Sequence, residues 1–185
     1  MENRILETER LYLREYSWED FPRLYEMISD PITMSHYSKP YDEAGAKRWM
    51  NWCLTNYQTY GFGLWAVILK ETGAFLGDCG LTMQNIHGQT LPEIGYHIHH
   101  IHWRKGYGKE AARAVRDWAF RNTEFPALYS YMKYTNVASY STAMSIGMTY
   151  KETYEDDQDT FTKVYAITRT QWEAETNIKE LYYEI

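Results

Sequence analysis

The sequence predicts a single α+β (mixed α/β) domain over residues 1–185 with a largely antiparallel sheet. Two patterns lead to this prediction. Segments that alternate apolar and polar residues, as strands do, are interspersed with segments whose apolar residues recur every three or four positions, as in helices. Turn-forming residues join several strand segments directly, which favours antiparallel hairpins. The length suits one sizeable core and is short for two.

The first half of the chain begins with a strand in which leucines alternate with Tyr12 and Arg14. Ser17 is a favourable N-cap with acids after it, so a helix begins there. That helix ends near Asp30, because the residue before Pro31 avoids helical angles. The elements expected in this half are a strand over 11–15, helices over 17–30 and 42–57, and strands over 64–69 and 74–83 joined by the turn 71–73.

The second half continues this mixture of strands and helices. A helix is expected from the glycines at 106 and 108 to about Asn122, with Arg116 on its solvent face. Gly147 stands where a helix over 139–146 would end. The remaining elements are strands over 93–98, 128–133, 148–155 and 161–168, the last two joined by the polar turn 156–159.

Composition and charge exclude some classes of function. A formal net charge of −6 argues against nucleic acid as a partner, which needs a basic face. The acidic balance is compatible with a cationic substrate and also with solubility alone. The longest apolar run, 62–69, is too short to span a bilayer, and the acids near the start do not fit a signal peptide. We therefore expect no membrane partner, and the two lone cysteines, Cys53 and Cys79, indicate a reducing, cytoplasmic setting.

The most informative segment runs from His102 to Ala111 and reads HWRKGYGKEA. Two glycines and two basic residues at a strand-to-helix turn predict an anion site, where free N–H groups contact a phosphate-bearing ligand. The spacing also satisfies a dinucleotide-binding fingerprint, but polar and cationic residues separate it from the preceding strand. A P-loop is excluded because Glu110 stands where Ser or Thr is required. A surface turn without a ligand stays open as the plainer alternative.

Further motifs occur in a fixed order along nearly the whole chain. They are Glu9-Arg10-Leu11-x-Leu13-Arg14, Glu93-Ile94-Gly95-Tyr96, Trp103 with Arg104-Lys105-Gly106-Tyr107-Gly108 and Glu110-Ala111, Asn136-x-x-Ser139, Gly147-Met148, and Tyr165-Ala166-Ile167-Thr168 with Trp172. Together they resemble the GNAT superfamily of acyl-CoA-dependent N-acetyltransferases, and within it the Rim-type branch of ribosomal-protein N-terminal acetyltransferases. Two departures are His99-His100 for the usual Asp-Pro and Met148 for Phe. The resemblance implies a central twisted, mostly antiparallel sheet of about seven strands flanked by helices.

The resemblance implies acetyl-CoA as the co-substrate, with no metal. The pantetheine arm would pair with strand backbone near Ile98 and His99, and the pyrophosphate would rest on backbone N–H groups. Because amides suffice there, loss of Gly106 or Gly108 should matter more than side-chain changes. The residues implied to bind acetyl-CoA are Ile98, His99, Arg104, Lys105, Gly106, Tyr107, Gly108, Lys109, Asn136 and Ser139.

Two catalytic residues follow from the same resemblance. Glu93 is the candidate general base, acting directly or through a water, and strand alternation places it on the same face as His97. A structural or solvated acid is its plainer alternative. Ser139 is the candidate that contacts the CoA arm and protonates the leaving thiolate; its plainer alternative is a helix N-cap. Tyr140 is a second candidate proton donor.

The histidines at 97, 99, 100 and 102 raise the question of a metal site. Alternation places the first two on one face and the last two on the other, and no third ligand is near in sequence, so no metal is expected. The expected partner is an amine acceptor, either a protein N-terminus or a small molecule. The aromatic segments 18–25, 36–41 and 49–60 are expected to wall its cleft. A homodimer is the default expectation because twofold dimers are the commonest oligomers.

Three functions of different classes are therefore compared. The leading hypothesis is an acetyl-CoA-dependent N-acetyltransferase that acts on a primary amine by direct attack with a general base. The alternative is a catalytically degenerate module that binds CoA as a sensor or interaction partner. A nicotinamide-dependent oxidoreductase is the third, and it predicts NAD binding.

Overall fold

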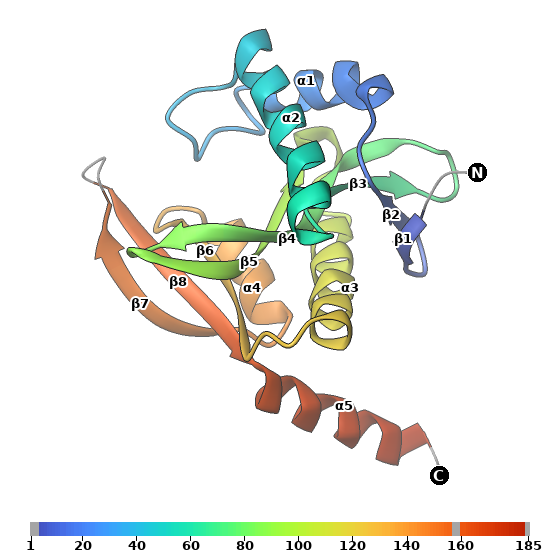
Figure 1. The fold of residues 1–185 in the computed structure, drawn as a ribbon, viewed down its shortest axis with the longest axis vertical. Helices are drawn as coiled ribbons and strands as arrows, with labels where there is room; N and C mark the ends of the chain where they lie inside the picture. Colours follow the sequence, from blue (N-terminus) through green and yellow to red (C-terminus); the bar gives the residue numbers. More distant parts are fainter. Residues whose placement is uncertain (1–3, 157–159, 184–185) are drawn as a thin grey trace. The chain divides into compact units, whose positions relative to one another are not determined.

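The computed structural model describes residues 4–156 and 160–183. Within them, eight strands hydrogen-bond in the order β1-β2-β3-β4-β5-β6-β8-β7, accompanied by five α-helices (Figure 1). The strands are β1 (Arg4–Glu7), β2 (Leu11–Arg14), β3 (Leu64–Leu69), β4 (Phe75–Ile86), β5 (Gln89–Ile98), β6 (Ala127–Lys133), β7 (Thr149–Glu155) and β8 (Phe161–Thr168). The helices are α1 (Phe21–Ser29), α2 (Glu43–Tyr60), α3 (Tyr107–Asn122), α4 (Val137–Ser145) and α5 (Arg169–Tyr183), with 3₁₀ turns η1 (Trp18–Asp20) and η2 (His100–His102). None of these helices combines the length and apolar character that crossing a membrane requires.

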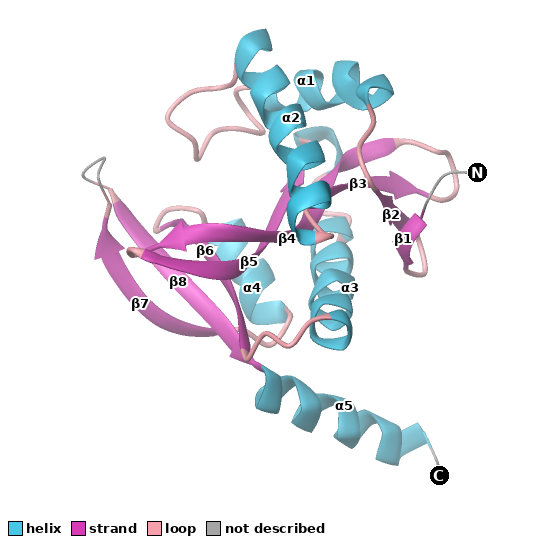
Figure 2. Cartoon of the chain, in the orientation of Figure 1, coloured by secondary structure: helices cyan, strands magenta, loops and turns pink. Residues whose placement is uncertain are grey.

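The α+β class and the mostly antiparallel sheet are confirmed, and Figure 2 shows helices and strands mixed along the chain. The structure adds β1, which pairs antiparallel with β2, so the described sheet has eight strands rather than about seven. Its sequence Arg4-Ile5-Leu6-Glu7 does not alternate apolar and polar residues, which explains why the sequence did not reveal this strand. It also adds the helix α5 after β8. Residues 157–159 of the predicted turn 156–159 lie outside the described residues.

The chain forms two compact units, the first made of Met1–Thr82 and Ile94–Val115. In this unit β2 pairs antiparallel with β3, and β3 with β4. Asp42 caps α2 by accepting a hydrogen bond from the Gly45 N–H at 2.7 Å. The apolar faces of α1 and α2 are buried with residues of β2 and β3, because a helix stripe and a sheet face both require cover. The fully buried members of this core include Leu24, Met27, Ile28, Ala46, Met50, Cys53 and Ala66.

The second unit comprises Met83–Glu93 and Arg116–Ile185. Here β8 lies between β6 and β7, antiparallel to both. Trp172 of α5 stacks on Phe120 of α3 and donates from its indole N–H to Asp117 at 2.8 Å. The prediction that Arg116 faces solvent is wrong: its side chain is buried, pairs with Asp117 and donates to the Ile146 carbonyl. The sequence contained no sign of α5, which covers that position.

Candidate functional site

A turn between β5 and α3 presents backbone N–H groups. Arg104 and Gly106 adopt positive φ angles of 62° and 81°, and α3 begins directly afterwards. The Glu110 N–H donates to the Gly106 carbonyl at 3.0 Å, which closes the first helical turn. The amides of residues 107–109 precede that bond, and such N–H groups carry partial positive charge at a helix N-terminus. The turn has the geometry that the predicted anion site requires.

The two glycines of this turn are required for different reasons. The φ angle of Gly106 lies in the left-handed region, where a Cβ is disfavoured, so the backbone dictates the residue type. Gly108 lies inside α3. A Cβ built on it would lie 3.5 Å from Ile98 Cγ1, which is ordinary van der Waals contact. Packing therefore does not require a glycine at 108, whereas close approach of a ligand to the backbone would.

Arg10 holds this turn against the start of the chain. Its Nε and Nη2 each approach Glu110 Oε2 at 2.7 Å, and its Nη1 donates to the Lys105 carbonyl at 2.9 Å. The guanidinium also lies 4.7 Å from the ring centroid of Tyr107. Burial alone would raise the pKa of Glu110, but hydrogen bonds from Thr8 and Arg10 outweigh it and lower the pKa. This role of Arg10 was not predicted from the sequence, although Arg10 lies in the opening motif Glu9-Arg10-Leu11-x-Leu13-Arg14.

The predicted pantetheine contacts lie where β5 ends. The Ile98 carbonyl accepts a hydrogen bond from the indole Nε1 of Trp103 at 2.6 Å. The His99 N–H donates to the Leu76 carbonyl, and the His99 carbonyl accepts from the His102 N–H, both at 2.9 Å. Since a carbonyl oxygen has two lone pairs, both carbonyls retain the capacity for a second donor.

A chain of hydrogen bonds joins β4, β5 and the segment after α1. Asp78 is fully buried in β4, and its carboxylate accepts from the Tyr16 hydroxyl at 3.1 Å. The Nδ1 of His97 lies 2.7 Å from the other carboxylate oxygen, and its Nε2 lies 2.5 Å from the Tyr37 hydroxyl. Burial and the Asp78 charge raise the pKa of Tyr16 well above its ordinary value, so that phenol keeps its proton and donates. Buried carboxylates are costly unless paired, which this arrangement achieves.

Aromatic rings pack around His97. Trp49 and Tyr37 have ring centroids 5.2 Å and 5.8 Å from the imidazole. Tyr41 contacts both of these rings, and Trp52 packs on Trp49. Two of the three predicted acceptor-wall segments, 36–41 and 49–60, therefore meet at His97. Within the described residues, the Trp49 indole N–H has no hydrogen-bond partner.

The third predicted wall segment, 18–25, forms its own row of ring contacts. Trp18 packs on Phe21, and Phe21 stacks on Tyr25, with centroid separations of 5.7 Å and 6.1 Å. These rings cover α1 and the adjoining η1 turn. The helix that carries them was predicted, but the partners of its aromatic side chains were not.

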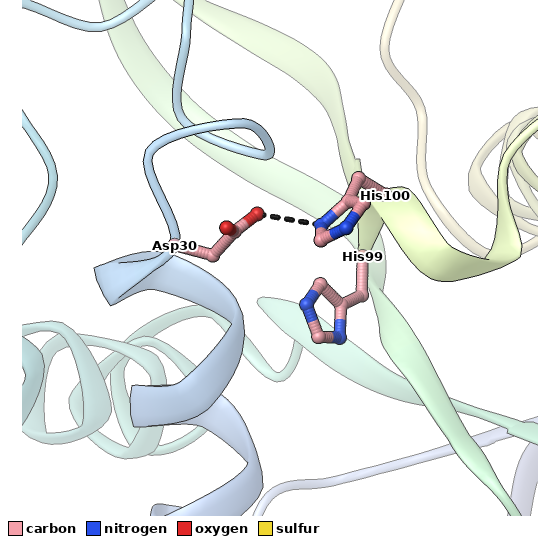
Figure 3. Close-up of side chains that lie close together, drawn as sticks. All are labelled: Asp30, His99 and His100. Carbon is pink, nitrogen blue, oxygen red and sulfur yellow. Dashed lines mark hydrogen bonds and ion pairs between the residues drawn. The ribbon is translucent and has the colours of Figure 1, made fainter.

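A cluster of possible metal ligands lies where α1 ends. One ligand atom each from Asp30, His99 and His100 lies within 4.8 Å of the others (Figure 3). The sequence reasoning placed no third ligand near the histidines; Asp30 is remote in sequence, and strand alternation ends at Ile98. Two imidazoles and a carboxylate are a ligand set that zinc accepts.

Hydrogen bonds already engage this cluster. The Asp30 carboxylate accepts from the Thr33 N–H at 2.6 Å and lies 2.7 Å from His100 Nδ1. Desolvation opposes ionisation, but the hydrogen bonds from Thr33 and His100 prevail and hold the Asp30 pKa at about 2. The arrangement thus joins the end of α1 to the end of β5 without requiring an ion, and the absence of a metal stays a prediction.

The remaining predicted residues belong to the second unit. Glu93 lies opposite Tyr129 in the parallel pairing of β5 with β6. Asn136 is the N-cap of α4, and its side chain accepts from the Ser139 N–H at 3.1 Å. The cap position predicted as a plainer alternative for Ser139 is therefore taken by Asn136. Tyr140 stacks on Tyr165 at 6.1 Å between centroids.

Comparison with known proteins identifies the family. The acetyltransferase (GNAT) domain matches residues 10–149, which is most of the chain. The chain belongs to the GNAT acetyltransferase family. The GNAT protein is 39% identical to the uncharacterized protein YkkB of Bacillus subtilis over 149 residues, covering 80% of this chain and 87% of YkkB. It is 32% identical to an acetyltransferase of known structure from Agrobacterium tumefaciens, with a TM-score of 0.75 over 88% of this chain and 92% of that one.

Distant GNAT structures share the fold. RimL, a ribosomal L7/L12 alpha-N-protein acetyltransferase solved in complex with coenzyme A, has a TM-score of 0.74 over 90% of this chain and 98% of RimL. Its identity is 13%, so this likeness concerns the fold alone. The expected resemblance to GNAT acetyltransferases with Rim-type neighbours is confirmed. The GNAT fold uses acetyl-CoA.

In this GNAT enzyme, sequence reasoning found the turn but missed the residue that secures it and the partners of His97. It did not single out Asp78, Tyr37 or Arg10. A signal for Asp78 was present, because it is the one charged residue in the otherwise apolar and small-residue stretch from Phe75 to Leu81. No comparable local signal marks Tyr37, which reaches His97 from 60 residues away in sequence.

Proposed function

We propose that this GNAT acetyltransferase moves the acetyl group of acetyl-CoA to a primary amine. The observation that carries the proposal is the turn before α3, where residues 107–109 precede the first helical hydrogen bond and Arg10 secures the turn. An anionic pyrophosphate matches the partial positive charge of these amides. The room beside Gly108, which packing does not use, supports close approach of such a ligand.

The reaction requires few groups. The neutral amine attacks the thioester carbonyl, a C–N bond forms, the C–S bond breaks, and the electron pair stays on sulfur. The attacking nitrogen gives up a proton and the thiolate gains one. Positioning both reactants supplies roughly 7–11 kcal/mol of the barrier. In this proposal Ile98 and His99 backbone lie along the pantetheine arm, and the turn over 104–109 holds the pyrophosphate.

We assign the two proton transfers to the residues that the sequence suggested. Glu93 is the proposed general base, directly or through a water. Ser139 is proposed to contact the CoA arm with Asn136 and to protonate the thiolate, with Tyr140 as the alternative donor. Substitutions Glu93→Gln, Ser139→Ala and Tyr140→Phe test each assignment. A variant that keeps the wild-type kcat removes its residue from the scheme.

The proposed acceptor is a primary amine on a protein N-terminus or on a small molecule. RimL is a ribosomal L7/L12 alpha-N-protein acetyltransferase, which supports including N-terminal peptides among the acceptors. The net charge of −6 favours cationic acceptors. The proposed setting is the cytoplasm, since Cys53 and Cys79 are both free thiols.

The deciding experiment measures free thiol released from acetyl-CoA against a panel of N-terminal peptides, polyamines, aminoglycosides and amino acids. Thiol release that depends on one acceptor class is expected. Calorimetry with acetyl-CoA is run in parallel. Tight binding with an inert thioester across the panel would favour a CoA-binding module instead, and no acetyl-CoA binding at all would refute the donor site.

A further inference from the structure

The hydrogen-bond chain through Asp78 and His97 fixes which imidazole nitrogen carries a lone pair. The carboxylate of Asp78 can only accept when it is ionised, so the Nδ1 of His97, 2.7 Å away, holds the proton in this pair. The neutral ring then has its lone pair on Nε2. Tyr16 donates to the same carboxylate from the buried side, which holds the acid in place.

The Nε2 atom lies at the end of this chain that meets an exposed residue, Tyr37. The His97 side chain keeps 16% of its surface exposed, whereas that of Asp78 is fully buried. The partner of Nε2 is the hydroxyl of Tyr37, a side chain in an exposed segment between α1 and α2. The Tyr37 hydroxyl shows where a hydrogen-bonding group reaches Nε2. An N–H of the acceptor amine would take the same position when it donates to His97. The ring of Trp49 packs against His97, and Tyr41 packs against Trp49. Such aromatic rings favour an amine that is cationic or has an apolar substituent.

The contacts proposed for acetyl-CoA lie next to His97 along β5. His97 directly precedes Ile98, whose carbonyl is a proposed contact of the pantetheine arm. Both residues belong to the first compact unit, as does the turn over 104–109. His97, which the buried Asp78 carboxylate orients, thus belongs to the same unit as the turn over 104–109 that is proposed to bind acetyl-CoA.

We propose that His97, in place of Glu93, is the catalytic residue that accepts the proton of the acceptor amine at Nε2, and that Asp78 is a positioning residue for its imidazole. This inference rests on the proposed acetyl transfer. As the amine nitrogen bonds to the acetyl carbon and the C–S bond breaks, the nitrogen's proton passes to Nε2. The imidazolium that forms is stabilised by the Asp78 carboxylate and later returns the proton to solvent.

The test compares two identical substitutions at different histidines. In His97→Asn, the side-chain amide can still donate to Asp78 in place of Nδ1, so the buried carboxylate keeps a partner, while the Nε2 base is removed. The control is His87→Asn, because His87 is exposed, pairs with Glu152 in the second unit and has φ 49°, which Asn tolerates. We expect His97→Asn to lower kcat at least about 100-fold, the usual contribution of a general base. The KM and the Kd for acetyl-CoA should stay within about threefold. His87→Asn should match the wild type.

A second measurement separates catalysis from a structural role. In ¹⁵N-imidazole NMR spectra, His97 should show an unprotonated Nε2 in the neutral ring. Asp78→Asn should shift the ring toward the Nε2–H tautomer and lower kcat, with acetyl-CoA affinity retained. External imidazole should restore part of the turnover of His97→Gly, which a merely structural histidine would not show.

The outcomes distinguish this inference from the proposed function. Wild-type protein without acetyl-CoA binding or thiol release refutes the proposed function itself. Wild-type turnover together with a His97→Asn kcat within about threefold of wild type overturns the inference and leaves the function standing. A protonated Nε2 in the neutral wild-type ring also overturns it. If Glu93→Gln strongly lowers kcat and His97→Asn does not, the general base is Glu93 and the inference is wrong.

Discussion

Gly108→Ala separates ligand binding from folding. A methyl group at this position would meet Ile98 Cγ1 at 3.5 Å, so the folded protein accepts it. Alanine also has a higher helix propensity than glycine, by about 1 kcal/mol in a helix interior and less in a first turn. We therefore expect the free energy of unfolding to stay equal or to rise by up to about 1 kcal/mol, which is a shift in Tm of roughly 2–4 °C.

Binding of acetyl-CoA should weaken in the same variant. The methyl group would stand where the pyrophosphate approaches the backbone, and at least one N–H contact to the anion would be lost. A hydrogen bond to a charged group contributes about 1.5–3 kcal/mol, which corresponds to a roughly 10- to 100-fold increase in Kd. Titration calorimetry with acetyl-CoA and with CoA measures the change directly.

The comparison with two neighbours sharpens the test. Gly106→Ala should both destabilise the fold, by about 1–2 kcal/mol from its positive φ, and weaken binding. Lys109→Ala keeps its backbone amide and should weaken binding less than Gly108→Ala does. A Gly108→Ala protein that binds acetyl-CoA with wild-type affinity refutes the pyrophosphate site. One whose Tm is several degrees lower refutes the inference that a Cβ fits beside Ile98.

Three further results are expected. Arg10→Ala should raise the Kd for acetyl-CoA and lower the Tm, because Glu110 and Lys105 lose their shared donor; Arg10→Lys should recover little, since it has no bidentate fork. Asp30 has a folded pKa of about 2, below its ordinary value of 3.8, so its contribution to stability is present above about pH 4 and is lost as pH falls toward 2. The difference in free energy of unfolding between wild type and Asp30→Asn should therefore be constant above about pH 4 and shrink as pH falls toward 2, as measured by denaturant unfolding across that range. Cys53 and Cys79 are fully buried, and burial with the nearby Asp78 charge raises the pKa of the Cys53 thiol. A thiol reagent should therefore label neither cysteine until the protein unfolds, and rapid labelling of native protein would contradict the buried core.

Local sequence signals were enough to predict most helices and strands and the turn over 104–109. The acids after Ser17, the Asp30-Pro31 step and the glycines at 106 and 108 act through neighbouring backbone, so their effect can be predicted from adjacent residues. The segment β1 and the helix α5 were not predicted. The first does not alternate apolar and polar residues, and the second is stabilised by contacts such as that of Trp172 with Phe120.

Only the tertiary structure decided what surrounds the turn and which side chains meet. Asp78 pairs with His97 across 19 positions, Tyr37 with His97 across 60, and Arg10 with Glu110 across 100. Such pairings depend on strand register and on the path of the chain, which no local propensity encodes. The sequence by itself determined the family and the fold class, and it predicted an anion-binding turn. The three-dimensional packing determined that a buried carboxylate orients His97, because burial and hydrogen-bond direction exist only in the folded chain.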